Sequence, residues 1–245
     1  MDTPHLILLF LAVGLIAFLY SSVGHAGASG YIATMTLFGL APTVIRPTAL
    51  VLNILVASIG TFQFWRAGHF SWKLFWPFAL LSIPAAYVGG YLQPSASVLR
   101  VLIGVVLLFS AARLVFRRSD PPQTVPPSRP VAIGTGAGLG FLSGLTGTGG
   151  GIFLTPLLLF FQWAHIRQAA AVSALFIWVN SIAGLVGYFT KVHSIPSLGF
   201  ILAAAAIVGG IVGSHLASRR FAVRVISFLL ATVLLIAGMK LLFTR

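Results

Sequence analysis

The chain contains no cysteine and only two acidic residues, Asp2 and Asp120, among its 245 residues. The absence of cysteine excludes disulfide bridges, thiolate metal ligands and a cysteine nucleophile. Neither carboxylate lies within an apolar segment, so a carboxylate relay for protons or sodium ions has no candidate. The six histidines are scattered without metal-ligand spacing. We therefore expect no metal site and no cofactor.

Charge of either sign is scarce, because only 7% of the residues are charged while 58% are hydrophobic. A soluble domain of this length needs a more polar surface. Several apolar runs approach the roughly 18–20 residues that a helix needs to cross a bilayer. The composition predicts an all-α, polytopic protein of the cell (inner or plasma) membrane, with about 8–10 transmembrane or half-membrane helices.

The net charge of +13 would suggest a nucleic-acid partner in a soluble chain. Here the basic residues stand singly or in pairs between apolar runs, which is typical of topology signals, so we expect no nucleic-acid binding. With the central hydrophilic stretch in the cytoplasm, ten of the fifteen Lys and Arg residues lie inside and five outside. That distribution sets the predicted orientation.

A proline-rich stretch, residues 117–130, divides the chain into a first repeat (1–116) and a second repeat (131–245). Ser22 matches Ser143 at an offset of 121 residues, and Ile45-Arg46 matches Ile166-Arg167. Charge counting places the two arginines on opposite faces, which predicts repeats of inverted topology. The expected apolar segments are 6–22, 27–40, 46–66, 73–92 and 97–116, then 131–146, 148–162, 167–189, 196–217 and 221–243.

Glycine clusters at 21–30 and 143–151 interrupt the helices before the short second segment of each repeat, which either spans the membrane or turns back. Inverted repeats with broken helices indicate a secondary transporter. The helix N-terminus after each break suits an anion. The predicted substrate-binding residues are Gly24, His25, Gly27, Ser29, Asn53, Thr146, Thr148, Gly149, Gly150, Ser173, Trp178 and Asn180.

Several of these residues also fit structural roles. Glycines permit close helix packing, which we expect for Gly89, Gly90 and the cluster 134–138, and intramembrane amides form interhelical hydrogen bonds. His25 fits an anion contact, a carrier of a coupling proton or a structural position. Arg46 and Arg167 fit either anion attraction and gating at two mouths or anchoring of helix ends.

The runs Gly144–Leu158 and Arg167–Ala174 resemble the second-repeat signature of the TauE/SafE sulfite exporter family. The first copy, Val23–Met35, departs from it: Ala28 and Ser29 replace glycines, and Met35 stands where the second copy has Pro156. The resemblance covers nearly the whole chain. It implies transport of sulfite, sulfonates, sulfoacetate-like compounds or other small organic anions, by uptake or export, and no catalysis.

Two other functions remain alternatives at this point. A passive anion channel would use the same residues without alternating access. An intramembrane serine protease would use Ser29 of the sequence Gly27-Ala28-Ser29-Gly30, although the second repeat has no serine there. The expected partners are a small anion, the lipid bilayer and, as one option, further copies of the chain.

Overall fold

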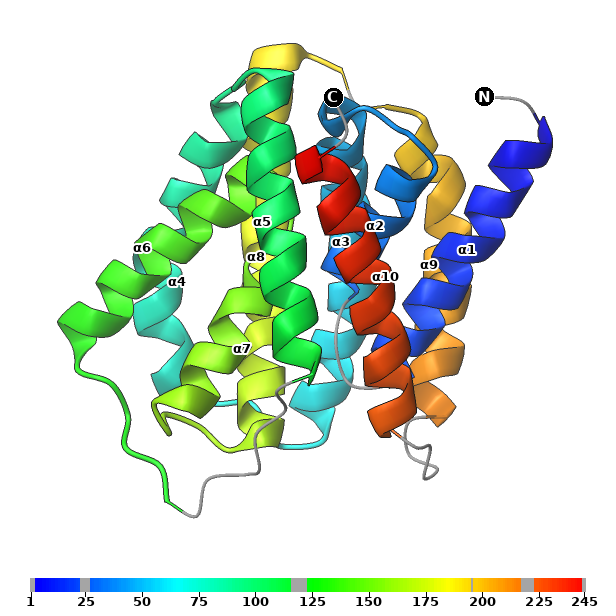
Figure 1. The fold of residues 1–245 in the computed structure, drawn as a ribbon. Coiled ribbons are helices and arrows are strands. Elements are labelled where there is room, and N and C mark those ends of the chain that lie inside the picture. The colour runs from blue at the N-terminus through cyan, green and yellow to red at the C-terminus, as the bar shows by residue number, and fades with distance from the viewer. Residues whose placement is uncertain (1–2, 23–26, 116–122, 195, 217–222, 244–245) are drawn as a thin grey trace.

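The computed structural model describes residues 3–22, 27–115, 123–194, 196–216 and 223–243 (Figure 1). The regular elements in these ranges are ten α-helices without a β-strand, as the composition predicts. They are α1 (Thr3–Ser22), α2 (Ala28–Leu37), α3 (Pro42–Arg66), α4 (Trp72–Tyr91), α5 (Ala96–Val115), α6 (Arg129–Thr146), α7 (Gly151–Phe160), α8 (Ile166–Val192), α9 (Leu198–Leu216) and α10 (Val223–Phe243).

Helices at equivalent places in the two halves have similar lengths. Helices α3 and α8 have 25 and 27 residues, α4 and α9 have 20 and 19, and α5 and α10 have 20 and 21. Figure 1 shows α1 and α5 descending through the molecule while α6 and α10 rise. Equivalent helices that run in opposite directions are the arrangement expected of an inverted repeat.

The second helix of each half is short. Both α2 and α7 contain ten residues. Ten residues extend about 15 Å, which is half the thickness of a bilayer core of about 30 Å. These two elements are therefore half-helices, too short to span a membrane alone.

Within the described residues, four helices are long and apolar enough to cross a membrane: the spans Thr3–Ser21, Pro42–Arg66, Trp72–Tyr91 and Ile166–Val192. Bulky apolar side chains also cover the outside of the molecule. Leu11, Val208 and Phe228 are 61%, 63% and 67% exposed. An apolar surface of this extent suits lipid rather than water as the surrounding medium, in line with a membrane protein.

The two halves are interlocked rather than separately packed, because α4 packs against α6 and α8, and α1 packs against α9. The contact between α4 and α6 depends on glycines. Gly136 and Gly140 face the backbone of Phe78 and Ser82, and Gly144 faces that of Ala86. A Cβ atom at any of these glycines would collide with a carbonyl oxygen of α4, so the two backbones approach closely.

The expected packing role of the glycines is confirmed at some positions only. Gly89 and Gly90 face the backbones of α6 and α8, and Gly136 faces α4. Gly134 and Gly138 have no atom within 4 Å of the position of an added Cβ. Only one face of α6 is therefore restricted to glycine.

Replacing Gly140 by alanine should lower the free energy of unfolding by about 1–3 kcal/mol, because the new methyl group meets backbone that cannot yield. Gly138→Ala is the matched control on the open face of the same helix. It should leave stability unchanged or raise it by up to about 1 kcal/mol, since alanine favours helix over glycine. Thermal unfolding of the purified protein in detergent or nanodiscs measures both, and equal melting temperatures would contradict the packing.

Candidate functional site

The break between α6 and α7 is built from glycines in a backbone conformation that other residues rarely adopt. Helix α6 ends at Thr146, and Gly147, Gly149 and Gly150 follow with φ values of 81°, 73° and 77°. Side chains with a Cβ are strained in this left-handed region. The chain can therefore stop one helix and begin the next within four residues, Gly147 to Gly150.

Side chains of α3 and α8 hold this break in place. The Nδ2 group of Asn53 donates a hydrogen bond to the carbonyl oxygen of Gly147, at 3.1 Å. A Cβ on Gly149 would lie 2.6 Å from Cγ2 of Ile177, 3.0 Å from Oγ of Ser181 and 3.3 Å from Nδ2 of Asn53. Asn53 and Ser181 thus approach the same glycine from two different helices.

The N-terminus of α7 points its free backbone donors into this region. The first α-helical bond runs from the N–H of Leu154 to the carbonyl of Gly150, at 3.1 Å. The N–H groups of Gly151 and Ile152 therefore precede the intrahelical hydrogen bonds. Together with the helix dipole they present a partial positive charge suited to an anion.

Three buried polar atoms beside the break have no hydrogen-bond partner among the described residues. They are Oδ1 of Asn53, Oγ of Ser143 and Oγ of Ser181. Each of the three residues is 0% exposed. A Cβ on Gly150 would lie 3.2 Å from Cβ of Ser143, so this hydroxyl also belongs to the break. Unpaired polar groups are costly in an apolar interior, which marks the cluster as a candidate ligand site.

The predicted threonines bond to each other instead. The hydroxyl of Thr146 lies 2.7 Å from the carbonyl oxygen of Leu142 and 3.0 Å from the hydroxyl of Thr148. When Thr146 donates to Leu142, Thr148 donates to Thr146, and neither proton is left for a ligand. The available hydroxyl donors are those of Ser143 and Ser181.

The two polar residues predicted on α8, Ser173 and Asn180, already form hydrogen bonds within the protein. The hydroxyl of Ser173 bonds to that of Thr155 on α7 at 2.8 Å, one turn into the half-helix. Asn180 is fully buried and donates to the carbonyl of Phe176 at 2.8 Å, which leaves its Oδ1 without a partner among the described residues. Trp178 is half-buried. Phe176 adjoins Gly150 and Ser181 adjoins Gly149, so Asn180 lies on α8 at the level of the break.

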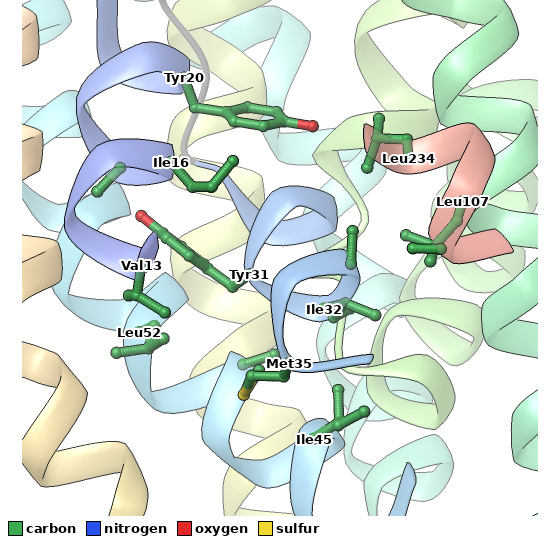
Figure 2. Packing of buried hydrophobic residues seen from close by; sticks show 14 of the residues in the cluster. Val13, Ile16, Tyr20, Tyr31, Ile32, Met35, Ile45, Leu52, Leu107 and Leu234 are labelled. Carbon is green, nitrogen blue, oxygen red and sulfur yellow. The ribbon is translucent and has the colours of Figure 1, made fainter. Parts of the chain in front are cut away.

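The break in the first half has different surroundings. Gly24 and His25 lie outside the described residues. Gly27 has φ of 84°, and the hydroxyls of Ser29 and Tyr20 form a 2.8 Å hydrogen bond. Figure 2 shows the rings of Tyr20 and Tyr31 near the half-helix α2, among aliphatic side chains of several helices. Tyrosine rings thus pack against the described glycines of the first break, Gly27 and Gly30, whereas an amide and serines of three helices adjoin the second.

Arg46 is 0% exposed, so it lies inside the protein rather than at an exposed mouth. Its guanidinium donates to the carbonyl oxygens of Gly144 (3.1 Å, from Nε), Leu92 (2.8 Å, from Nη1) and Gly89 (2.7 Å, from Nη2), and also to Gly90. The carbonyls at the C-terminus of α4 carry the negative end of the helix dipole. They stabilise a buried positive charge that has no carboxylate partner among the described residues.

Arg167 differs from its sequence counterpart because it is exposed at the start of α8. It lines a cavity of about 520 Å³ together with His69, His165 and Gln168. The matched arginines therefore have different surroundings: one ties helices together and the other borders an open cavity.

Sequence reasoning missed Ser181 and Thr155 as members of this region. Ser173, Ile177 and Ser181 are spaced by four residues, which places them on one face of α8 toward the break. Ser143 had a signal, because it matches Ser22 in the repeat. These spacings could have identified the serines, although not their lack of a partner.

The buried arginine should contribute more to stability than the exposed one. Arg46→Met leaves four carbonyl groups without their donor and should lower the free energy of unfolding by about 2–5 kcal/mol. Arg167→Met is the matched control and should change it by less than about 0.5 kcal/mol. Denaturation of both variants in nanodiscs tests this, and an equal loss in the two would contradict the assigned role of Arg46.

Comparison with known proteins places this architecture in a family. Residues 9–241 match the sequence profile described as sulfite exporter TauE/SafE. A probable membrane transporter protein of Sinorhizobium fredii, y4hK, is 41% identical over 241 residues, covering 96% of this chain and 97% of that protein. The probable membrane transporter protein YjnA of Bacillus subtilis is 27% identical over 259 residues, covering 97% and 98%. No solved structure matches the chain significantly. The chain belongs to the sulfite exporter TauE/SafE family of membrane proteins.

Proposed function

We propose that the protein transports small organic or sulfur-containing anions, such as sulfite, sulfonates or sulfoacetate, across the cell membrane. The observation that carries this proposal is the buried N-terminus of α7 beside the unpartnered polar atoms of Asn53, Ser143 and Ser181. We name these three residues and the N-terminus of α7 the α7 site. It offers backbone and hydroxyl donors to an anion, and the described part of the chain places no carboxylate beside it to repel the charge.

Support for alternating access comes from a difference between the two halves. Helices α4 and α8 touch backbone to backbone, because Gly90 faces the carbonyl of Gly184 and Gly187 faces that of Tyr87. The equivalent contact between α9 and α3 is made through a side chain, with a Cβ on Gly210 lying 3.5 Å from Cγ1 of Val56. The α4–α8 contact is therefore closer than the α3–α9 contact, and we call these the tightly packed side and the loosely packed side.

A groove lies on the loosely packed side. It has a volume of about 750 Å³ and is lined by Ser58, Phe62, Gln63 and Arg66 of α3 and by Ile211 of α9, among others. Ser58 lies five residues from Asn53 along α3, a rise of about 7.5 Å. We propose that an anion approaches the α7 site from this groove, at the end of the molecule that holds the C-terminus of α3.

The two arginines fit this cycle as gating elements. Arg46 joins α3 to α4 and α6 at the tightly packed side, and we propose that it latches that side closed. Arg167, exposed at the end where α8 begins, would attract anions by its charge. Figure 1 shows the C-terminus of α3 at the same end of the molecule as the chain that enters α6. With the linker in the cytoplasm of a multi-pass inner-membrane protein, the groove at the C-terminus of α3 faces the cytoplasm.

Uptake into proteoliposomes tests the substrate and the site together. A bound anion should stabilise the protein by about 2.7 kcal/mol at a hundredfold excess over its Kd, so thermal shifts across sulfite, sulfoacetate, aryl sulfonates and acetate identify a transportable anion. Ser143→Ala and Ser181→Ala should then each lower its uptake about tenfold, because each removes a donor. Ser110→Ala, a buried serine that bonds within α5, is the control and should transport normally.

If all three serine variants transport alike, the α7 site is wrong. Accumulation of the anion against its electrochemical gradient would distinguish a coupled transporter from the passive channel, which can only dissipate the gradient.

Labelling of single cysteines tests the direction of access, since the chain has no native cysteine. Ser58→Cys, in the groove, should react with a membrane-impermeant thiol reagent applied from the linker side. Ala183→Cys, 9% exposed on the tightly packed side of α8, should not react from either side. Transported anion in excess should slow labelling at Ser58→Cys if the groove closes during the cycle. If Ser58→Cys does not react and Ala183→Cys reacts readily, the open side is the opposite of the one assigned here.

A further inference from the structure

We infer that the α7 site selects monoanions that carry a hydrogen-bond donor of their own, such as a singly protonated oxyanion, over anions that only accept. This inference rests on the proposed anion transport and narrows its substrate class, because it ranks a protonated oxyanion such as hydrogen sulfite ahead of sulfonates and sulfoacetate.

Asn53 supplies the hydrogen-bond acceptor of the site. Its Nδ2 group donates to Gly147, which fixes the orientation of the amide and leaves Oδ1 as the unpartnered atom. An amide oxygen can only accept a hydrogen bond. An anion whose oxygens all accept would leave Oδ1 unpaired in a site closed to water, whereas an anion with a hydroxyl group would satisfy it.

The hydrogen-bond donors of the site determine where the charged oxygens of the ligand lie. Ser143 and Ser181 have hydroxyls without partners among the described residues, and the N–H groups of Gly151 and Ile152 precede the first intrahelical bond. These groups converge on the same glycines and suit the charged oxygens of the ligand. The site therefore combines several donors with one acceptor, a pattern that a protonated oxyanion complements.

The balance of charge favours a single negative charge. The N-terminus of α7 supplies about half a positive charge. The guanidinium of Arg46 supplies one more, which the carbonyls at the end of α4 partly offset. The Nε group of Arg46 donates to the carbonyl oxygen of Gly144 at 3.1 Å, so this charge lies three residues before Gly147 along the chain. A monoanion is compensated here, but a dianion would bring a second charge into a buried site.

Methylphosphonate and methanesulfonate test the inference as a matched pair of nearly equal shape. At pH about 5, below the second pKa of a phosphonate, both are monoanions, and only methylphosphonate carries a hydroxyl donor. Binding to the full-length protein in nanodiscs, measured by calorimetry or thermal shift, should be at least about tenfold tighter for methylphosphonate. At pH about 8.5 methylphosphonate becomes a dianion and should lose this advantage, while methanesulfonate serves as the control for titration of the protein.

Variants of Asn53 and Ser181 test the roles of the acceptor and of the donors separately. Asn53→Leu should bring the affinities for the two anions to within about twofold of each other, because the acceptor is gone. Asn53→Ser provides a smaller change in case the leucine variant does not fold. Ser181→Ala should weaken both anions alike and preserve their ratio, and Ser110→Ala should change neither.

Equal binding of the two anions, or tighter binding of methanesulfonate, would overturn this inference and leave anion transport standing. An unchanged ratio in a folded Asn53 variant would likewise remove Asn53 from the recognition. Binding of neither anion, together with no shift from any anion of the transport panel, would overturn both this inference and the proposed α7 site.

Discussion

Backbone that leaves a helix inside an apolar molecule needs polar partners from the protein, because lipid supplies none. The break between α6 and α7 meets this requirement through Asn53, which bonds the carbonyl of Gly147. The same requirement explains why amides and serines gather at this point of a chain with so few polar side chains. The need for polar partners at irregular backbone thus has two results. It holds the break in place, and it puts hydrogen-bond donors where a ligand can bind.

Arg46 meets a related requirement at the ends of helices. The last carbonyls of α4 have no intrahelical donor, and the guanidinium supplies several N–H groups at once. Lys240 of α10 does the same for α2, since its Nζ group donates to the carbonyls of Thr36 and Leu37 at 3.1 and 3.0 Å. Cations pair with helix ends here because the chain has almost no carboxylates to pair with them.

Much of the architecture could be predicted from the sequence, because the periodicity and length of the apolar runs directly reflect the helices. The expected segments 27–40 and 148–162 are the two half-helices α2 and α7, longer in the prediction because the apolar pattern continues into their flanking turns. The partners of Arg46 could not be predicted, since they lie 43 to 98 residues away on two helices. The difference between the two breaks could not be predicted either. It depends on the packing of the Tyr31 ring against Gly27, which the glycine clusters in the sequence do not reveal.

The glycine contact between α4 and α6 joins a helix from one half of the chain to a helix from the other, as does the contact between α1 and α9. Helices that meet backbone to backbone have little room to slide. The rigid bodies of any conformational change would therefore be pairs drawn from both halves, and the sequence repeat would not coincide with the moving unit. A half-chain expressed alone would expose to lipid the helix faces that pack against the other half. The single chain keeps those faces covered by holding both halves in one molecule.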